Sequence, residues 1–155
     1  SRFRLGWLGE ADQHGAQVPK SHYGTVTRFG GTAYSVQHSL NVWSSGMWVC
    51  TSTGSTAAMA AAGGKVMQLD DPDLQYLIRE HMMENSNEDV DSTVDNRFFN
   101  QGKMHLRWNS HKGRIFIDGS HLSHNIELGD EIMIDNDAPP LQIFLHDNKT
   151  RPAVA

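Results

Sequence analysis

Short stretches in which apolar and polar residues alternate run along most of the chain, with the period expected of half-buried β-strands. The clearest lies at 2–8, where Phe3, Leu5 and Trp7 alternate with polar or small residues. The same reasoning predicts strands at 23–29, 34–42, 47–50, 104–108, 114–117, 122–128, 131–134 and 141–145. Residues 74–79 fit either a strand or a helical turn.

Turn and loop signals separate these stretches at spacings typical of a sandwich or barrel-like sheet pair. Asp118-Gly119 is a strong hairpin signal, because both positions tolerate a positive φ. Residues 9–22 and 84–102 are largely polar, and we expect long loops there. The pattern therefore predicts a mainly β fold, a β-sandwich of short antiparallel strands with one short Ala-rich helix.

The helix is expected at 57–62, where an alanine run follows the hydroxyl-rich loop 51–56 and ends at a Gly-Gly pair. Amides at a helix start carry partial positive charge, hydroxyls bond ribose or phosphate oxygens, and a glycine allows close approach. The alternative is that Ser55 or Thr56 merely caps the helix and the alanines pack under a sheet. From the residues alone this alternative is favoured. The loop is not a P-loop, since the Gly-Lys-Ser/Thr ending is absent.

Composition narrows the function classes. The chain has 155 residues and a formal net charge of −5, and its Lys and Arg residues are scattered, which argues against a nucleic-acid partner. Cys50 is the single cysteine, so an intracellular and cytoplasmic location is expected. No apolar run reaches membrane-spanning length. Because Ser1 opens directly into a strand pattern, we expect a fragment whose missing N-terminus leaves mitochondrial, plastid or peroxisomal locations open.

Residues 49–64 read Val-Cys-Thr-Ser-Thr-Gly-Ser-Thr-Ala-Ala-Met-Ala-Ala-Ala-Gly-Gly. This segment resembles the signature of NAD kinases, roughly Val-Ser-Thr-Pro-Thr-Gly-Ser-Thr-Ala-Tyr followed by Gly-Gly. Ala-Ala-Met after Gly-Ser-Thr is similar to the plant-type NADH kinase branch. The chain also resembles that branch at four further segments, which occur in the same order: 73–80, 115–119, 128–132 and 137–139.

The resemblance implies the C-terminal, mainly β domain of a two-domain NAD(H) kinase, here at 1–146 with a tail at 147–155. The family transfers the γ-phosphoryl group of ATP, with Mg²⁺, to the adenosine 2′-hydroxyl of NADH or NAD. Its base is the Asp of a Gly-Gly-Asp-Gly motif in the N-terminal domain, and this motif is absent here. We therefore expect no catalytic residue and no metal site in this chain, and inactivity by itself. The expected partners are the missing half or a partner chain, and further copies in a homodimer or larger homo-oligomer.

Carried over by position, the resemblance implies that residues 53–58 line the dinucleotide site, namely Thr53, Gly54, Ser55, Thr56, Ala57 and Ala58. Thr56 and Ala57 are the main expected contacts, and Thr51 and Gly54 are expected to shape the loop. Three residues depart from the common family pattern. Ser45 stands where many members have an Asp that holds a ribose, and Ala58 stands where many have a Tyr near a base. Ala61 stands where a Ser is usual.

Two rival functions remain open at this stage. The first is a catalytically inactive structural subunit or dinucleotide sensor, favoured by the absent base and by Ala61. The second is the C-terminal domain of a lipid kinase of related fold, which would need a more apolar pocket. Among other candidates, His105 and His111 have no carboxylate at ligand spacing, and Cys50 is expected to be buried rather than reactive.

Overall fold

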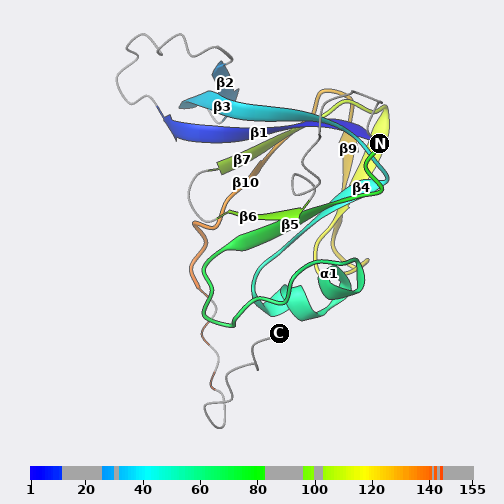
Figure 1. Ribbon diagram of the computed structural model, residues 1–155. Helices are drawn as coiled ribbons and strands as arrows, with labels where there is room; N and C mark the ends of the chain where they lie inside the picture. Colours follow the sequence, from blue (N-terminus) through cyan, green and yellow to red (C-terminus); the bar gives the residue numbers. More distant parts are fainter. Residues whose placement is uncertain are drawn as a thin grey trace, which may run out of the picture. The chain divides into compact units, whose positions relative to one another are not determined.

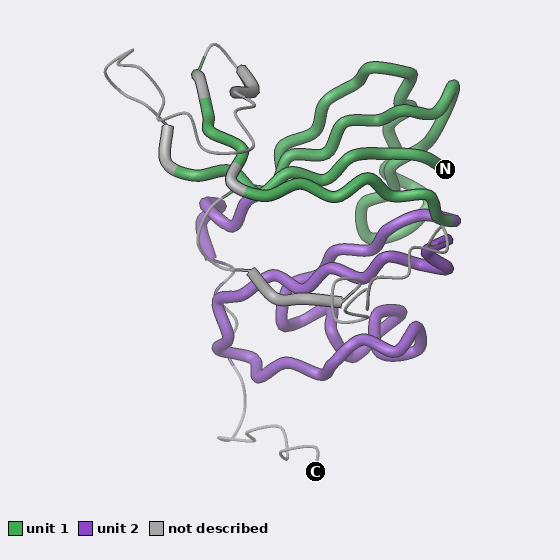
Figure 2. The backbone as a smooth tube through the Cα atoms, turned by 45° about the horizontal axis from the view of Figure 1, so that its top comes forward, with its two compact units in different colours: residues 1–44, 102–134 green, residues 45–101, 135–155 purple. Residues whose placement is uncertain are grey.

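The computed structural model describes residues 1–11, 26–29, 32–82, 96–99, 103–140, 142 and 144. The chain divides into two compact units, Ser1–Ser44 with Gly102–Ile134 and Ser45–Gln101 with Asp135–Ala155 (Figure 2). Within the described residues the fold consists of antiparallel sheets and one short α-helix, so the mainly β prediction is confirmed. The boundary expected at 146–147 lies outside the described residues and stays a prediction.

The described part of unit 1 contains a five-stranded antiparallel sheet in the order β10-β7-β1-β3-β2 (Figure 1). Its strands are β1 (Arg2–Ala11), β2 (Val26–Phe29), β3 (Thr32–Trp43), β7 (Lys103–Trp108) and β10 (Glu131–Ile134). Leu5 of β1 lies opposite Leu40 of β3 and Leu106 of β7. Directly paired residues share a face of the sheet, so this register gathers apolar side chains on one side. Phe3 and Leu5 are almost fully buried there.

The opposite face of the same sheet carries a polar cluster. His105 lies opposite Gly6 and is buried, with its Nε2 atom 3.6 Å from Oε1 of Glu131. Burial lowers the pKa of His105, because the imidazolium loses hydration; Arg107 and Arg4 lower this pKa further, and Glu131 opposes the shift. The sequence placed no carboxylate beside His105. The register supplies one, because Glu131 is opposite Arg107, two residues from His105.

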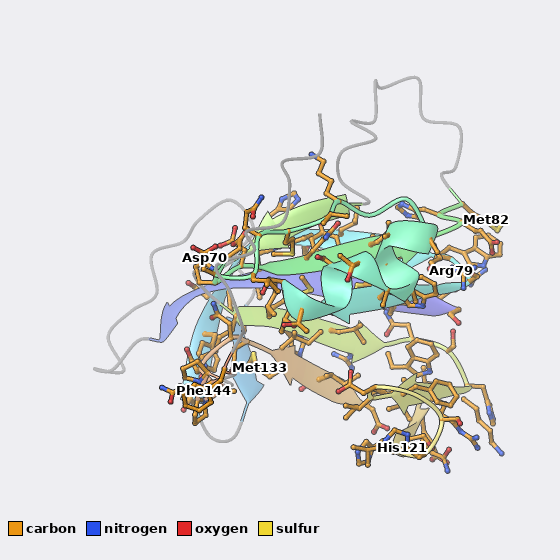
Figure 3. All side chains as sticks on the ribbon, turned by 90° about the horizontal axis from the view of Figure 1, so that it is seen from below. Asp70, Arg79, Met82, His121, Met133 and Phe144 are labelled. Carbon is orange, nitrogen blue, oxygen red and sulfur yellow. The ribbon has the colours of Figure 1, made fainter. Side chains whose placement is uncertain are left out.

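A hairpin in unit 1 joins β8 (Lys112–Phe116) to β9 (Ser123–Glu127). Asp118 and Gly119 both adopt positive φ, 50° and 120°, which confirms the hairpin prediction. The backbone amide of Ile117 donates to the carbonyl of Leu122 at 3.0 Å and closes the loop. His121 lies in this loop (Figure 3).

The described part of unit 2 contains a three-stranded sheet of β4 (Gly46–Cys50), β5 (Leu74–Arg79) and β6 (Asn96–Phe99), with β5 in the middle. Residues 74–79 are therefore a strand, which decides the alternative that the sequence left open. Gln75 and Tyr76 of β5 are 0% exposed. Strands β4 and β5 pair from Gly46 opposite Arg79 to Cys50 opposite Gln75.

Three loop and strand predictions were wrong where they can be compared. Residues 9–11 continue β1, because Ala11 still pairs with Tyr34 after two register shifts. Residues 96–99 form β6, since they find partners along β5. In the segment expected to be a strand at 141–145, Gln142 and Phe144 are not in a strand, and Phe144 is fully exposed. The other residues of the predicted loops lie outside the described ranges.

Candidate functional site

The bend that follows β4 is more helical than the sequence predicted. Residues 53–56, expected to be a loop, form the 3₁₀-helix η1 (Thr53–Thr56), and the α-helix α1 is shorter than expected (Ala58–Ala61). The N-cap residue of α1 is Ala57, and no side chain caps this helix. The alternative in which Ser55 or Thr56 serves only as a helix cap is therefore wrong. The physical reason lies in the packing of Ser55.

Ser55 is on the buried side of the bend and is 0% exposed. Its hydroxyl donates to the carbonyl of Ser52 at 2.6 Å and accepts from the amide of Met67 at 2.9 Å. Ser52 is also buried, and its hydroxyl donates to the carbonyl of Leu69 at 3.1 Å. A buried polar group needs such partners because it has lost its hydration. The side chain of Ser55, predicted as a ligand contact, thus holds the bend to the segment that follows α1.

The other side of the bend is exposed. The residues that share this exposure are Thr51, Thr53, Thr56, Ala57, Ala58 and Ala61. Three threonines, which carry hydroxyls, and three alanines of the bend are therefore accessible at the surface of unit 2. A bend sealed inside the core could not contact a ligand, and this bend is not sealed in that way.

Gly54 is half-buried between these two sides. A Cβ atom at this position would lie 3.2 Å from Cβ of Cys50, tighter than an ordinary contact. The glycine thus allows η1 to pack closely against the end of β4. Burial raises the pKa of the Cys50 thiol, which keeps it protonated and fits the expectation that this cysteine is not reactive.

The back of the bend is fixed by residues that sequence reasoning did not single out. The side-chain amide of Gln75 accepts from the backbone amide of Lys65 at 2.7 Å and donates to the carbonyl of Lys65 at 2.7 Å. A Cβ atom on Gly64 would meet Sδ of Met59 at 2.8 Å and Oε1 of Gln75 at 2.9 Å. One signal was available in the sequence. A glutamine inside the apolar run Leu74 to Ile78 requires a buried polar partner.

The structure does not bring Ser45 next to the bend. Ser45 precedes β4, whereas Thr51 follows it, so the extended strand separates them by about 20 Å. The amide and the hydroxyl of Ser45 both donate to the carbonyl of Arg79, at 3.1 and 3.3 Å. Arg79 ends β5 and is labelled in Figure 3. A single ligand would have to extend along β4 to contact Ser45 and the bend together.

The described ranges were compared with two further kinds of site, a metal-binding cluster and a membrane-spanning helix. No three His, Cys, Asp or Glu side chains among these residues gather closely enough to hold a metal ion. No helix in this part of the chain is both long and apolar enough to cross a bilayer.

Comparison with known proteins gives two relatives. The chain is 42% identical to an NADH kinase from Arabidopsis thaliana over 106 residues, covering 68% of this chain and 32% of the relative. It is also 42% identical to a probable NADH kinase from Oryza sativa subsp. japonica over 112 residues, covering 72% of this chain and 34% of the relative. The chain thus spans about a third of the length of the curated relatives that it matches.

No family model and no solved structure matches the chain. The identity to both relatives nevertheless extends well beyond the bend, because the matched length is several times that of the motif at 49–64. The resemblance inferred from that motif is confirmed, and this chain is a relative of the plant-type NADH kinases over the part that it shares with them.

Proposed function

We propose that this chain forms the dinucleotide-binding part of an NAD(H) kinase, which transfers the γ-phosphoryl group of ATP to the adenosine 2′-hydroxyl of NADH or NAD. The observation that carries the proposal is the identity of 42% to two plant proteins named as NADH kinases. The exposed threonines of the bend support it with polar groups suited to the ligand. A dinucleotide presents ribose hydroxyls, phosphate oxygens and flat rings.

The roles proposed for the bend follow from the chemistry of its exposed groups. The hydroxyls of Thr53 and Thr56 can each donate to a phosphate oxygen or pair with a ribose hydroxyl. Ala57 and Ala58 present only methyl groups, so a flat ring can approach the backbone closely. Phosphoryl transfer depends mainly on positioning and on charge stabilisation. In this proposal the chain supplies positioning, and Mg²⁺ arrives with ATP.

The proton acceptor is expected to lie outside these 155 residues, whose sequence contains no Gly-Gly-Asp-Gly. A ribose hydroxyl is a poor nucleophile until a base accepts its proton. We therefore propose that further sequence of the same protein, or a partner chain, contributes the base. The chain by itself should bind NADH without phosphorylating it.

The proposal is tested by titrating the purified chain with NADH and following the nicotinamide fluorescence. The wild-type chain should bind, and Thr56→Val, which keeps the side-chain shape but removes the hydroxyl, should weaken binding about three- to tenfold, the equivalent of one hydrogen bond. Thr32→Val is the matched control, because Thr32 is exposed in β3 of the other unit and should leave binding unchanged.

Three results would contradict parts of the proposal. A folded wild-type chain that binds neither NADH nor NAD would reject dinucleotide binding. Formation of NADPH from NADH and Mg-ATP by the chain alone would show that the base lies within it. Binding of diacylglycerol vesicles in place of NADH would favour the lipid kinase alternative.

A further inference from the structure

The segment that follows α1, residues 65–67, is tied by two buried polar side chains. Gln75 reaches it from β5 and Ser55 reaches it from η1. The carboxamide of Gln75 makes two hydrogen bonds to the backbone of Lys65, each 2.7 Å long. Ser55 accepts from the amide of Met67 at 2.9 Å. The two side chains therefore bond alternate residues, Lys65 and Met67, of the segment.

Gln75 also lies beside the start of the bend. It pairs in register with Cys50, the last residue of β4, from which the bend departs. Gln75 therefore connects two segments: its backbone pairs with the strand that enters the bend, and its side chain bonds the segment that follows α1. Fixing both ends restricts the conformations of the exposed residues between them, Thr51 to Ala61, without touching a ligand.

Helix α1 is packed into the same arrangement through Gly64. The amide of Gly64 donates to the carbonyl of Met59 at 2.9 Å, and Met59 is 3% exposed. Met59 and Gln75 leave no room for a side chain at Gly64. A shift of Gln75 would therefore be transmitted to the helix as well as to Lys65.

We propose that Gln75 is a positioning residue for the dinucleotide-binding face: its buried amide holds the bend and α1 in the arrangement that presents the hydroxyls of Thr53 and Thr56 together. This inference rests on the proposed function. A hydrogen-bonding edge binds a ligand well only if its groups are fixed beforehand, since ordering them on binding costs free energy. The carboxamide is specifically required, because Lys65 offers one donor and one acceptor and the carboxamide matches both.

The test compares Gln75→Met and Gln75→Glu with the control Gln68→Met, which makes the same change at an exposed position of unit 2. Three quantities are measured for each variant: the NADH affinity, the thermal unfolding temperature and the rate of hydrogen exchange at the Lys65 amide. Gln75→Met has no group to bond Lys65, so we expect faster exchange there and about tenfold weaker NADH binding, the equivalent of about 1.4 kcal/mol. Gln68→Met should match the wild type.

Gln75→Glu provides a pH readout of the hydrogen bond that the side chain donates to the Lys65 carbonyl, read as NADH affinity at pH values where thermal unfolding shows the variant to be folded. An ionised glutamate accepts from the Lys65 amide but cannot donate to its carbonyl, whereas a protonated glutamate can do both. Its deficit in NADH affinity relative to the wild type should therefore shrink as the pH is lowered, and that of Gln75→Met should not. If Gln75→Met fails to fold, this pH series alone decides the question.

Different results would overturn different claims. A wild-type chain that does not bind NADH would overturn the proposed function together with this inference. If the wild type binds while Gln75→Met exchanges faster at Lys65 yet keeps NADH affinity within about twofold, or if Gln75→Glu shows no pH-dependent recovery, the positioning role fails and the proposed function stands.

Discussion

Replacing Ser55 by alanine removes a hydroxyl that the structure uses only internally. The side chain is 0% exposed and bonds the Ser52 carbonyl at 2.6 Å and the Met67 amide at 2.9 Å. The Ser52 carbonyl also accepts from the amide of Ser55 at 3.3 Å, so it keeps a partner in the variant. The main loss is the acceptor for the buried Met67 amide. Removing one partner of a buried pair costs about 1–3 kcal/mol.

This loss is a substantial fraction of the stability of a domain, which is about 5–15 kcal/mol. Urea unfolding followed by far-ultraviolet circular dichroism measures it as a lower midpoint with an unchanged slope. Thr56→Ala is the matched control, because Thr56 follows Ser55 directly but is exposed. Its unfolding free energy should stay within about 0.5 kcal/mol of the wild type.

The two variants should behave in opposite ways when NADH binding is measured. Thr56→Ala should bind NADH more weakly at an unchanged free energy of unfolding. Ser55→Ala should show a lowered free energy of unfolding as its main effect. Equal stabilities for Ser55→Ala and the wild type would refute the assignment of Ser55 as a buried support. If Thr56→Ala lowered the free energy of unfolding by more than Ser55→Ala does, the division of the bend into buried and exposed residues would be refuted.

Two further predictions concern unit 1. Gly113→Ala should destabilise the chain by about 1–3 kcal/mol, because its Cβ would overlap the Trp108 ring, 2.7 Å from Cε2, and thermal unfolding that is unchanged would contradict this packing. The lowered pKa of buried His105 means that the unfolded chain binds more protons between that pKa and the ordinary value of 6.5. Stability present at neutral pH is therefore lost as the pH falls below about 6.5. His105→Gln should flatten this part of a urea-unfolding pH profile, and an equally steep profile would assign the dependence to other groups.

The alternation of apolar residues located most of the strands because a half-buried strand shows its pattern locally. Residues 131–134 form β10 with the predicted limits, and Asp118-Gly119 forms its hairpin loop with positive φ at both residues. In the same way the motif at 49–64 identified the plant-type relatives from sequence alone. These features depend on neighbours in the chain, and neighbours are visible in a sequence.

Long-range pairing, by contrast, decided what the local pattern left open. Residues 96–99 are strand only because β5 offers them a partner, and residues 74–79 are strand because they lie between β4 and β6. The carboxylate beside His105 arrives from β10, 26 positions along the chain (131 − 105 = 26). The local sequence around each residue does not show such long-range contacts.

For the candidate site, the sequence determined which groups are present, namely a run of hydroxyls, one glycine and small alanines. Only the tertiary structure decided which of those groups face outward. Ser55 and Thr56 are adjacent and chemically alike. Ser55 is buried and bonds Met67 and Ser52, whereas Thr56 is exposed. One of these partners, Ser52, lies just before η1 and the other, Met67, lies after α1. A hydroxyl takes whichever hydrogen bond the fold brings within reach.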